Sequence, residues 1–146
     1  MIRLEQYEWC RYWWDEAEKA AKPRVLLIGD SVTEGYRPYV KKLLPDHVFV
    51  DMLATSRGVD NGALLHEIDH MLDTPSFSYD VIHFNNGLHG EHLTIEEYSL
   101  FYREIITRII KKTAKAKLVL ATSTPITMIN FPEKIDEAKN FIVEER

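Results

Sequence analysis

Short apolar runs alternate along the chain with longer segments in which apolar residues recur every three or four positions. The apolar runs lie at 25–28, 48–54, 80–84 and 117–121. Each is short and ends in polar or glycine residues, which predicts a buried strand. The helical spacing occurs at 36–44, 61–72 and 94–115, and Thr94 with Glu97 forms a capping-box pattern at the start of the last segment. Strands that alternate with helices favour an α/β fold with a parallel sheet between two helical layers.

Both ends of the chain also carry helical patterns. In residues 2–21, apolar and aromatic side chains such as Trp9, Cys10 and Trp13 share one helical face. This pattern predicts an amphipathic helix within residues 1–22 that packs on the domain. Pro132 and Glu133 predict the start of a last helix. Because no repeat, linker or low-complexity segment interrupts the alternation, residues 1–146 are predicted to form a single domain.

The composition excludes several kinds of partner. The 146 residues are 45% hydrophobic and 28% charged, as in ordinary globular domains. A net charge of −5 gives no basic surface for nucleic acid, and no apolar run approaches the roughly 20 residues that cross a membrane. The single cysteine, Cys10, allows neither an intrachain disulfide nor a cysteine-based zinc cluster. No signal-peptide pattern begins the chain, so we expect a cytoplasmic protein whose partner is a small molecule.

The first predicted strand ends in Gly29-Asp30-Ser31, which brings a hydroxyl group to its carboxyl end. Open α/β sheets bind their ligands at that end, so Ser31 is a candidate nucleophile. The same residues also suit a simpler role, since Asp and Ser commonly cap helix amino termini. The loops at 29–35, 55–60, 85–92 and 122–131 are expected to converge at this edge of the sheet. Their Ser, Asn, His and Gly residues predict a polar site.

Three of these loops together resemble the motifs of the SGNH hydrolases, also called GDSL esterases and lipases. The matching residues are Gly29-Asp30-Ser31, Gly58 and the segment 85–89, and the resemblance covers about residues 23–146. It implies a three-layer α/β/α sandwich of the flavodoxin-like type. It also implies a serine esterase that needs no cofactor or metal and that removes O-acetyl groups from carbohydrates. In that assignment Ser31 is the nucleophile, and the backbone N–H groups of Ser31 and Gly58 belong to the oxyanion hole.

The third oxyanion donor stays open, because the segment 85–89 departs from the family's usual Gly-x-Asn-Asp. Alignment on Gly87 places His89 where the family has asparagine, while Asn86 lies one residue before the glycine. A primary amide donates without a change of protonation, which favours Asn86 slightly over His89. Asp30, Asn85 and His92 are expected to line the same site.

The family's catalytic base comes from an Asp-x-x-His block near the carboxyl terminus, and the sequence has no such block there. Asp80 and His83 match the letters, but their place in the third predicted strand assigns them to the core. We therefore expect a fifth strand and the Asp/His segment to come from a C-terminal fragment or a second chain, and this chain alone to be inactive. His89 or His92 is the alternative base, and a non-catalytic binding or scaffold domain is the alternative function.

His66, Glu67 and His70 match the H-E-x-x-H pattern of zinc hydrolases. On a helix, this spacing places the two imidazoles one turn apart. However, the segment lies on a predicted crossover helix away from the polar edge, and no third ligand is evident downstream. A solvated helix face is therefore the favoured interpretation, and a zinc hydrolase is the minor alternative.

Overall fold

The computed structural model describes residues 4, 6–20, 23–86 and 88–123, together with the backbone of 127–128 and 131–135. Its elements in chain order are β1 (Cys10–Trp13), β2 (Arg24–Gly29), α1 (Ser31–Leu43), β3 (Phe49–Thr55), α2 (Gly62–Asp73), β4 (Val81–Phe84), α3 (Ile95–Lys112), β5 (Lys117–Leu120), β6 (Thr127–Met128) and β7 (Phe131–Ile135). The alternation of strand and helix predicted from the sequence is confirmed from β2 to β5. Among the described residues, no helix is long and apolar enough to cross a membrane.

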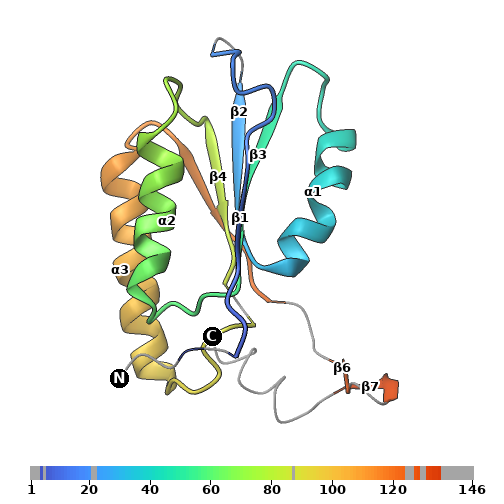
Figure 1. The fold of residues 1–146 in the computed structure, drawn as a ribbon, viewed down its shortest axis with the longest axis vertical. Helices are drawn as coiled ribbons and strands as arrows, with labels where there is room; N and C mark the ends of the chain where they lie inside the picture. The colour runs from blue at the N-terminus through green and yellow to red at the C-terminus, as the bar shows by residue number, and fades with distance from the viewer. Residues whose placement is uncertain are drawn as a thin grey trace.

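The main sheet has five strands in the order β1-β3-β2-β4-β5. Neighbouring strands from β3 to β5 run parallel, and β1 adds an antiparallel strand beside β3. Helix α1 covers one face of the sheet, while α2 and α3 lie side by side on the other (Figure 1). The predicted α/β class with a mostly parallel sheet is therefore confirmed. Because the parallel strands point the same way, their carboxyl ends meet at one edge.

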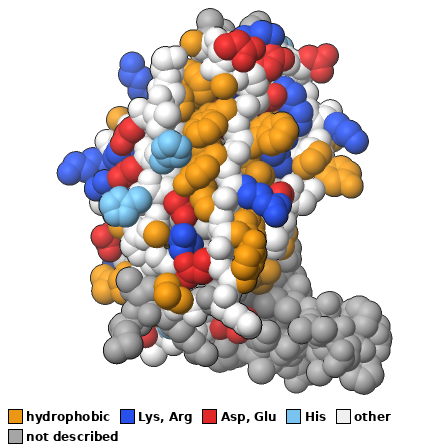
Figure 2. Space-filling view, viewed as in Figure 1, with side chains coloured by type: hydrophobic (Ala, Val, Ile, Leu, Met, Phe, Trp, Pro, Cys, Tyr) orange, Lys and Arg blue, Asp and Glu red, His pale blue; other side chains and the backbone are white. Residues whose placement is uncertain are grey.

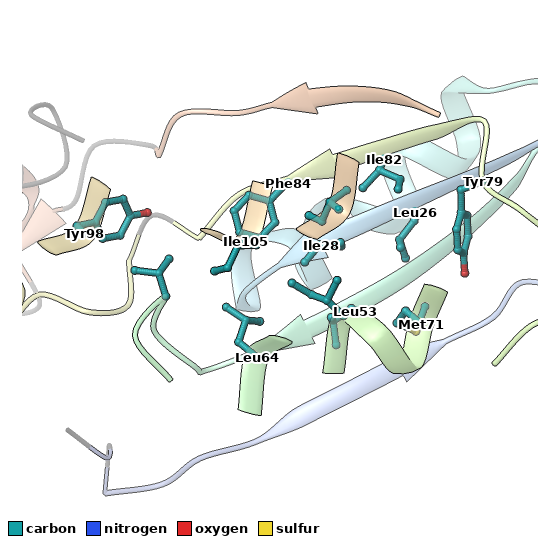
Figure 3. Packing of buried hydrophobic residues seen from close by; sticks show 13 residues of the cluster. Leu26, Ile28, Leu53, Leu64, Met71, Tyr79, Ile82, Phe84, Tyr98 and Ile105 are labelled. Carbon is teal, nitrogen blue, oxygen red and sulfur yellow. The ribbon is translucent and has the colours of Figure 1, made fainter. Parts of the chain in front are cut away.

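The hydrophobic core lies between the sheet and the helices α2 and α3. Buried side chains from strands and helices point toward one another there (Figure 3): Leu26, Ile28, Leu53, Leu64, Met71, Tyr79, Ile82, Phe84, Tyr98 and Ile105. Full burial of one such side chain contributes about 1.5–3 kcal/mol relative to exposure. This packing fixes the strands whose ends carry the polar loops.

The predicted N-terminal helix is wrong in the described residues, because Cys10–Trp13 forms strand β1. Strand β1 pairs antiparallel with β3, with Tyr12 opposite Leu53. The rings of Tyr12 and Trp14 stack with centroids 5.9 Å apart, as expected for side chains two residues apart on one face of a strand. Figure 2 shows apolar side chains along the middle of the molecule, where β1 runs in the same view in Figure 1. Trp13 lies on the opposite side of β1 from Tyr12 and Trp14 and is 52% exposed. The aromatic-rich segment 10–13 therefore forms an edge strand of the sheet and not part of a helix.

The predicted last helix is also wrong at its start, because Phe131–Ile135 is strand β7 and pairs antiparallel with β6. Proline fits the first turn of a helix, but it is also tolerated on edge strands, where its missing N–H has no partner to lose. Residues 136–146 of the predicted helix lie outside the described residues.

Helix α1 begins at Ser31, five residues before the predicted start at residue 36. Asp30 is its N-cap, and the side-chain oxygen Oδ1 accepts a 2.9 Å hydrogen bond from the backbone N–H of Val32. Gly35 and Pro38, which weaken helices, lie within its first turns and hide its start in the sequence. Ser31 therefore lies directly at the junction between β2 and α1.

Candidate functional site

The loops after β2 and β4 meet through Asp30 and His89. Asp30 is 1% exposed, and its oxygen Oδ2 lies 3.9 Å from Nε2 of His89. That separation exceeds a hydrogen bond but is short enough for an ion pair when the imidazole is protonated. Within the described residues, Oδ2 of Asp30 is buried and has no hydrogen-bond partner. The acidic group beside the candidate nucleophile is therefore directed toward the third predicted motif.

The loops after β3 and β4 touch through two glycines. A Cβ atom built on Gly58 would lie 3.2 Å from both the Cα and the nitrogen of Gly90. Gly90 has a φ of +84°, a backbone conformation that residues with side chains rarely adopt. Both glycines are therefore required for the close approach of these loops, and sequence reasoning singled out only Gly58.

Asn86 connects the same two loops but lies beneath the surface. Its side-chain nitrogen Nδ2 donates a 2.8 Å hydrogen bond to the carbonyl oxygen of Arg57, and its backbone oxygen accepts one of 3.0 Å from the hydroxyl of Tyr98. Only 2% of Asn86 is exposed. The amide therefore holds the residue that precedes Gly58, and one of its two N–H groups is used in doing so.

Asn85 brings the fourth loop to the same edge. Its side-chain nitrogen donates hydrogen bonds of 3.0 Å to the carbonyl oxygens of Ala121 and Thr122, which directly follow β5. Its backbone N–H donates a 2.9 Å bond to the carbonyl oxygen of Ile28 in β2. Together with the contacts of Asp30 and Gly58, these bonds show that the segments after β2, β3, β4 and β5 meet at one edge. Residues 31–35 of the first predicted loop belong to α1, and residues 124–126 and 129–130 of the last one lie outside the described residues.

Ser31 is exposed at the first position of α1. Its neighbour Asp30 caps this helix, so the capping interpretation of the motif holds for Asp30. The amino end of a helix carries partial positive charge from its unpaired N–H groups, which favours negative charge close to Ser31. Helix capping and a nucleophilic role for Ser31 are thus compatible in one motif.

Two cavities open beside these loops and share the side chain of Leu88. The larger has a volume of about 450 Å³, and its polar lining includes Glu8, Ser56, His89 and His92. The smaller has a volume of about 110 Å³ and lies between the start of α1 and the ends of β4 and β5. His92 also pairs with Asp60, with Nε2 lying 3.0 Å from Oδ2. Of the predicted site residues, Gly58, His89 and His92 line the larger cavity.

Sequence reasoning missed a charged cluster behind Gly58. The guanidinium group of Arg57 lies between two carboxylates, and it binds Glu8 ahead of β1 and Glu67 of α2, the latter at 2.5 Å. These contacts join residues that are far apart in the sequence, so no local motif predicts them. A strand prediction for residues 10–13 would have been the necessary first signal, because β1 brings Glu8 to this place.

The zinc-hydrolase hypothesis gains no support from α2. Glu67 is paired with Arg57, and His70 bonds to Thr74 at 3.0 Å and packs edge-on against the ring of Tyr12. In the part of the chain that the structure describes, no three metal-binding side chains cluster. The predicted helix is present, but its pattern serves packing and ion pairing.

The assignment of Asp80 and His83 to the core is wrong. Asp80 is exposed just before β4, and its oxygen Oδ2 accepts a 2.8 Å hydrogen bond from the backbone N–H of Arg24. His83 is half-buried and lines the smaller cavity, where burial lowers its pKa. The prediction was wrong because β4 is only four residues long, which puts His83 close to the carboxyl edge.

Comparisons with known proteins support the fold and leave the activity open. No protein-family model matches the chain, and no curated protein matches it. A solved structure described as "a putative platelet activating factor from Streptococcus pneumonia" matches with a TM-score of 0.56 and 18% sequence identity. The match covers 75% of this chain and 50% of that one, so this chain spans about half the length of the solved protein. At this identity the likeness shows the α/β fold alone.

Proposed function

We propose that this chain carries the nucleophile and oxyanion hole of an SGNH-type serine esterase. The observation that carries the proposal is the convergence of the Ser31, Gly58 and His89 loops at the carboxyl edge of the sheet. The order of the parallel strands, β3-β2-β4-β5, corresponds to the first four of the flavodoxin-like order, which supports a domain of that type. In such sheets ligands bind at the carboxyl ends of the strands.

In the proposed reaction, the hydroxyl oxygen of Ser31 attacks the ester carbonyl and gives up its proton to a general base. The tetrahedral oxyanion accepts hydrogen bonds from the backbone N–H groups of Ser31 and Gly58. Collapse breaks the ester C–O bond, and the base returns the proton to the departing alcohol. Water then hydrolyses the acyl-enzyme by the same steps, which releases a carboxylic acid and regenerates Ser31.

His89 is the better candidate for the third donor, in place of the initially favoured Asn86. His89 lines the larger cavity, whereas Asn86 is 2% exposed and donates to Arg57. We propose that the general base comes from an Asp-x-x-His segment, as the family resemblance implies. O-acetyl groups on carbohydrates are the proposed substrates, and they follow from the family resemblance.

The experiment is covalent labelling of the full-length protein with a fluorophosphonate, followed by peptide mass spectrometry. We expect the label on Ser31, and we expect Ser31→Ala to abolish hydrolysis of p-nitrophenyl acetate by at least about 10³-fold. Ser76→Ala is the matched control, because Ser76 is an exposed serine between α2 and β4, at the opposite end of the sheet. Unchanged turnover in Ser31→Ala would refute the proposal.

The alternative is a non-catalytic binding domain that keeps the fold. The position of Ser31 favours it, since Ser31 is not among the described residues that line the two cavities at this edge. The same experiment separates the two functions. A binding domain leaves Ser31 unlabelled and shows no Ser31-dependent hydrolysis, while carbohydrate binding would still be measurable by calorimetry.

A further inference from the structure

Strand β5 forms the edge of the sheet opposite β1, and its only neighbour among the described strands is β4. Two of its apolar side chains are about half exposed, Val119 at 46% and Leu120 at 51%. An apolar edge whose backbone groups point outward is a template for pairing with another chain. We propose that β5 pairs in antiparallel direction with β5 of a second copy of this chain, so that the two sheets join into one.

The hydrogen bonds between β5 and β4 show which backbone groups of β5 point outward. The N–H of Lys117 donates at 2.8 Å and the N–H of Ala121 donates at 3.0 Å to carbonyl oxygens in β4 or directly before it. Backbone groups alternate in direction along a strand, so Val119, which lies between these two residues, also turns its groups toward β4. The N–H and C=O groups of Leu118 and Leu120 therefore point away from the sheet.

One antiparallel register pairs these two residues with each other. Leu118 of each copy lies opposite Leu120 of the other copy, and each such pair exchanges both of its N–H···O bonds. Val119 then lies opposite Val119 of the second copy, in a pair without hydrogen bonds whose Cα atoms are about 4.5 Å apart. The two-fold axis passes through this central pair. The edge of β5 is thus self-complementary, as the interface of a symmetric dimer must be.

The charges along β5 are compatible with this register. Lys117 is the one charged residue of the strand. It lies opposite Ala121 of the second copy and not opposite a second lysine. Like charges directly opposite each other destabilise a strand pair, and none meet here. The other three residues of β5 are apolar, so pairing removes apolar surface from water.

The pair of strands alone is too small for a stable dimer, since specific interfaces bury about 800 Å² on each partner. A groove of about 270 Å³ between β5 and α3 enlarges the contact, and its lining includes the apolar side chains of Tyr102, Ile106 and Leu120. Ile110, one turn further along α3, is 56% exposed. Because the two-fold axis is perpendicular to the sheet, both α3 helices lie on the same face of the joined sheet. The two grooves therefore face each other across the strand pair.

The two candidate functional sites lie at opposite ends of this dimer. Antiparallel pairing directs the carboxyl ends of the two sheets in opposite directions, so each site is formed by one copy alone. Loss of the dimer is therefore expected to leave fluorophosphonate labelling of Ser31 unchanged. The dimer and the proposed esterase function can thus fail separately.

The first test places charges at the two-fold axis of the full-length protein and measures its mass by analytical ultracentrifugation. We expect the wild type to be a dimer that dissociates on dilution. Val119→Lys and Val119→Glu should each weaken association at least about tenfold, because like charges then lie directly opposite each other. An equimolar mixture of the two variants should restore the dimer.

Leu43→Lys is the matched control for these variants, because Leu43 is 85% exposed at the end of α1, on the other face of the sheet from α3 (Figure 1). It should leave the mass unchanged. Circular dichroism checks that each variant keeps its fold. A dimer that persists in both single variants at Val119, or a mixture that stays monomeric, would overturn the proposal.

The second test fixes the register by a disulfide. Val119→Cys is combined with Cys10→Ser, which removes the other thiol of residues 1–146. Mild oxidation should link two copies covalently, because a Cα separation of about 4.5 Å suits a disulfide. Leu43→Cys in the same background is the control and should stay monomeric on denaturing gels. Equal cross-linking in both variants would overturn the register.

Hydrogen exchange of the backbone amides of Leu118 and Leu120 shows what covers the edge. In the wild-type dimer both amides should exchange slowly, and in Val119→Lys both should exchange at least about tenfold faster. Slow exchange in a wild-type monomer would mean that another segment, such as the expected C-terminal fragment, covers β5 in place of a second copy. A wild-type monomer whose amides exchange fast would show an open edge. Either result would overturn the proposal.

Discussion

The side-chain amide of Asn86 donates a 2.8 Å hydrogen bond to the carbonyl oxygen of Arg57, and this bond holds the loop after β4 against the loop after β3. Arg57 is in turn held by its ion pairs with Glu8 and Glu67. Gly58 directly follows Arg57. Its backbone N–H is therefore held in place by the hydrogen bond to the Arg57 carbonyl and by the ion pairs of the Arg57 side chain. A donor of an oxyanion hole needs such a fixed position, because its contribution comes from preorganisation.

This arrangement predicts different effects for Asn86→Ala and His89→Ala. Asn86→Ala leaves the carbonyl of Arg57 without its buried partner, and we expect the free energy of unfolding to fall by about 1–3 kcal/mol in urea titrations. His89→Ala should lower kcat for p-nitrophenyl acetate by about 10²-fold, the scale of one lost oxyanion donor, with a smaller change in stability. Equal and small effects on kcat would mean that the third motif is assigned to the wrong residues.

Gly58→Ala tests the close approach of the two loops. The new Cβ would lie 2.9 Å from Oδ1 of Asp60 and 3.2 Å from backbone atoms of Gly90, so the loop must move by a few tenths of an ångström. We expect kcat to fall by at least about tenfold, because the Gly58 N–H then misses the oxyanion. Gly62→Ala is the control, since a Cβ there meets no atom within 4 Å. A comparable loss of kcat in Gly62→Ala would contradict this explanation.

The parallel strands, α2 and α3 were predictable because their signals are local, whereas α1 was predictable only from residue 36 onward. Four apolar residues that end in Gly29-Asp30 predict a buried strand and the turn after it, and β2 spans Arg24–Gly29. The capping box at α3 was also predicted, and Thr94 and Glu97 form both of its hydrogen bonds. The convergence of the loops followed from the parallel direction of the strands alone.

Strand β1 and the cluster of Arg57 could not be predicted in this way, because pairing across the sheet decides both. Residues 10–13 have apolar positions that fit a helical face as well as an alternating strand, and only the open edge of β3 selects the strand. Arg57 binds Glu8, which is 49 residues away in the sequence. Such contacts require the topology to be known first, so the sequence showed Gly58 but not the residues that brace it.

A buried ion pair at the opposite end of β2 gives a prediction for stability. The guanidinium group of Arg24 is fully buried, bonds to Asp51 at 2.8 and 3.0 Å, and lies 3.6 Å from the ring centre of Phe77. It also donates to the backbone oxygens of Asp15, Glu16 and Lys19. Arg24→Met leaves a buried carboxylate unpaired, so we expect a loss of about 3–5 kcal/mol in urea unfolding.

Two further variants separate the ion pair from general effects of losing an arginine. Arg24→Lys should restore little of the stability, because an ammonium group cannot make the same planar set of bonds. Arg11→Ala is the surface control, since Arg11 is 61% exposed and pairs with Glu34 near the surface. We expect it to change the free energy of unfolding by less than about 1 kcal/mol. A loss in Arg24→Met no larger than that in Arg11→Ala would contradict the prediction.

Asp69 on α2 gives a prediction for the dependence of stability on pH. Its carboxylate binds Arg108, and bonds to Lys112 at 3.0 Å, which lowers its pKa from 3.8 to about 2. The carboxyl group of Asp69 therefore takes up its proton at a lower pH in the folded state than in the unfolded state. Its contribution to the free energy of unfolding is complete above pH 3.8 and disappears as the pH falls through about 2. We expect Asp69→Asn to lower the urea midpoint near pH 7, and the difference from wild type to shrink steadily below about pH 4. In an Arg108→Ala background this pH dependence should weaken, because the main cause of the lowered pKa is gone. A difference in midpoint that stays constant from neutral to acidic pH would show that Asp69 acts through packing and not through its charge.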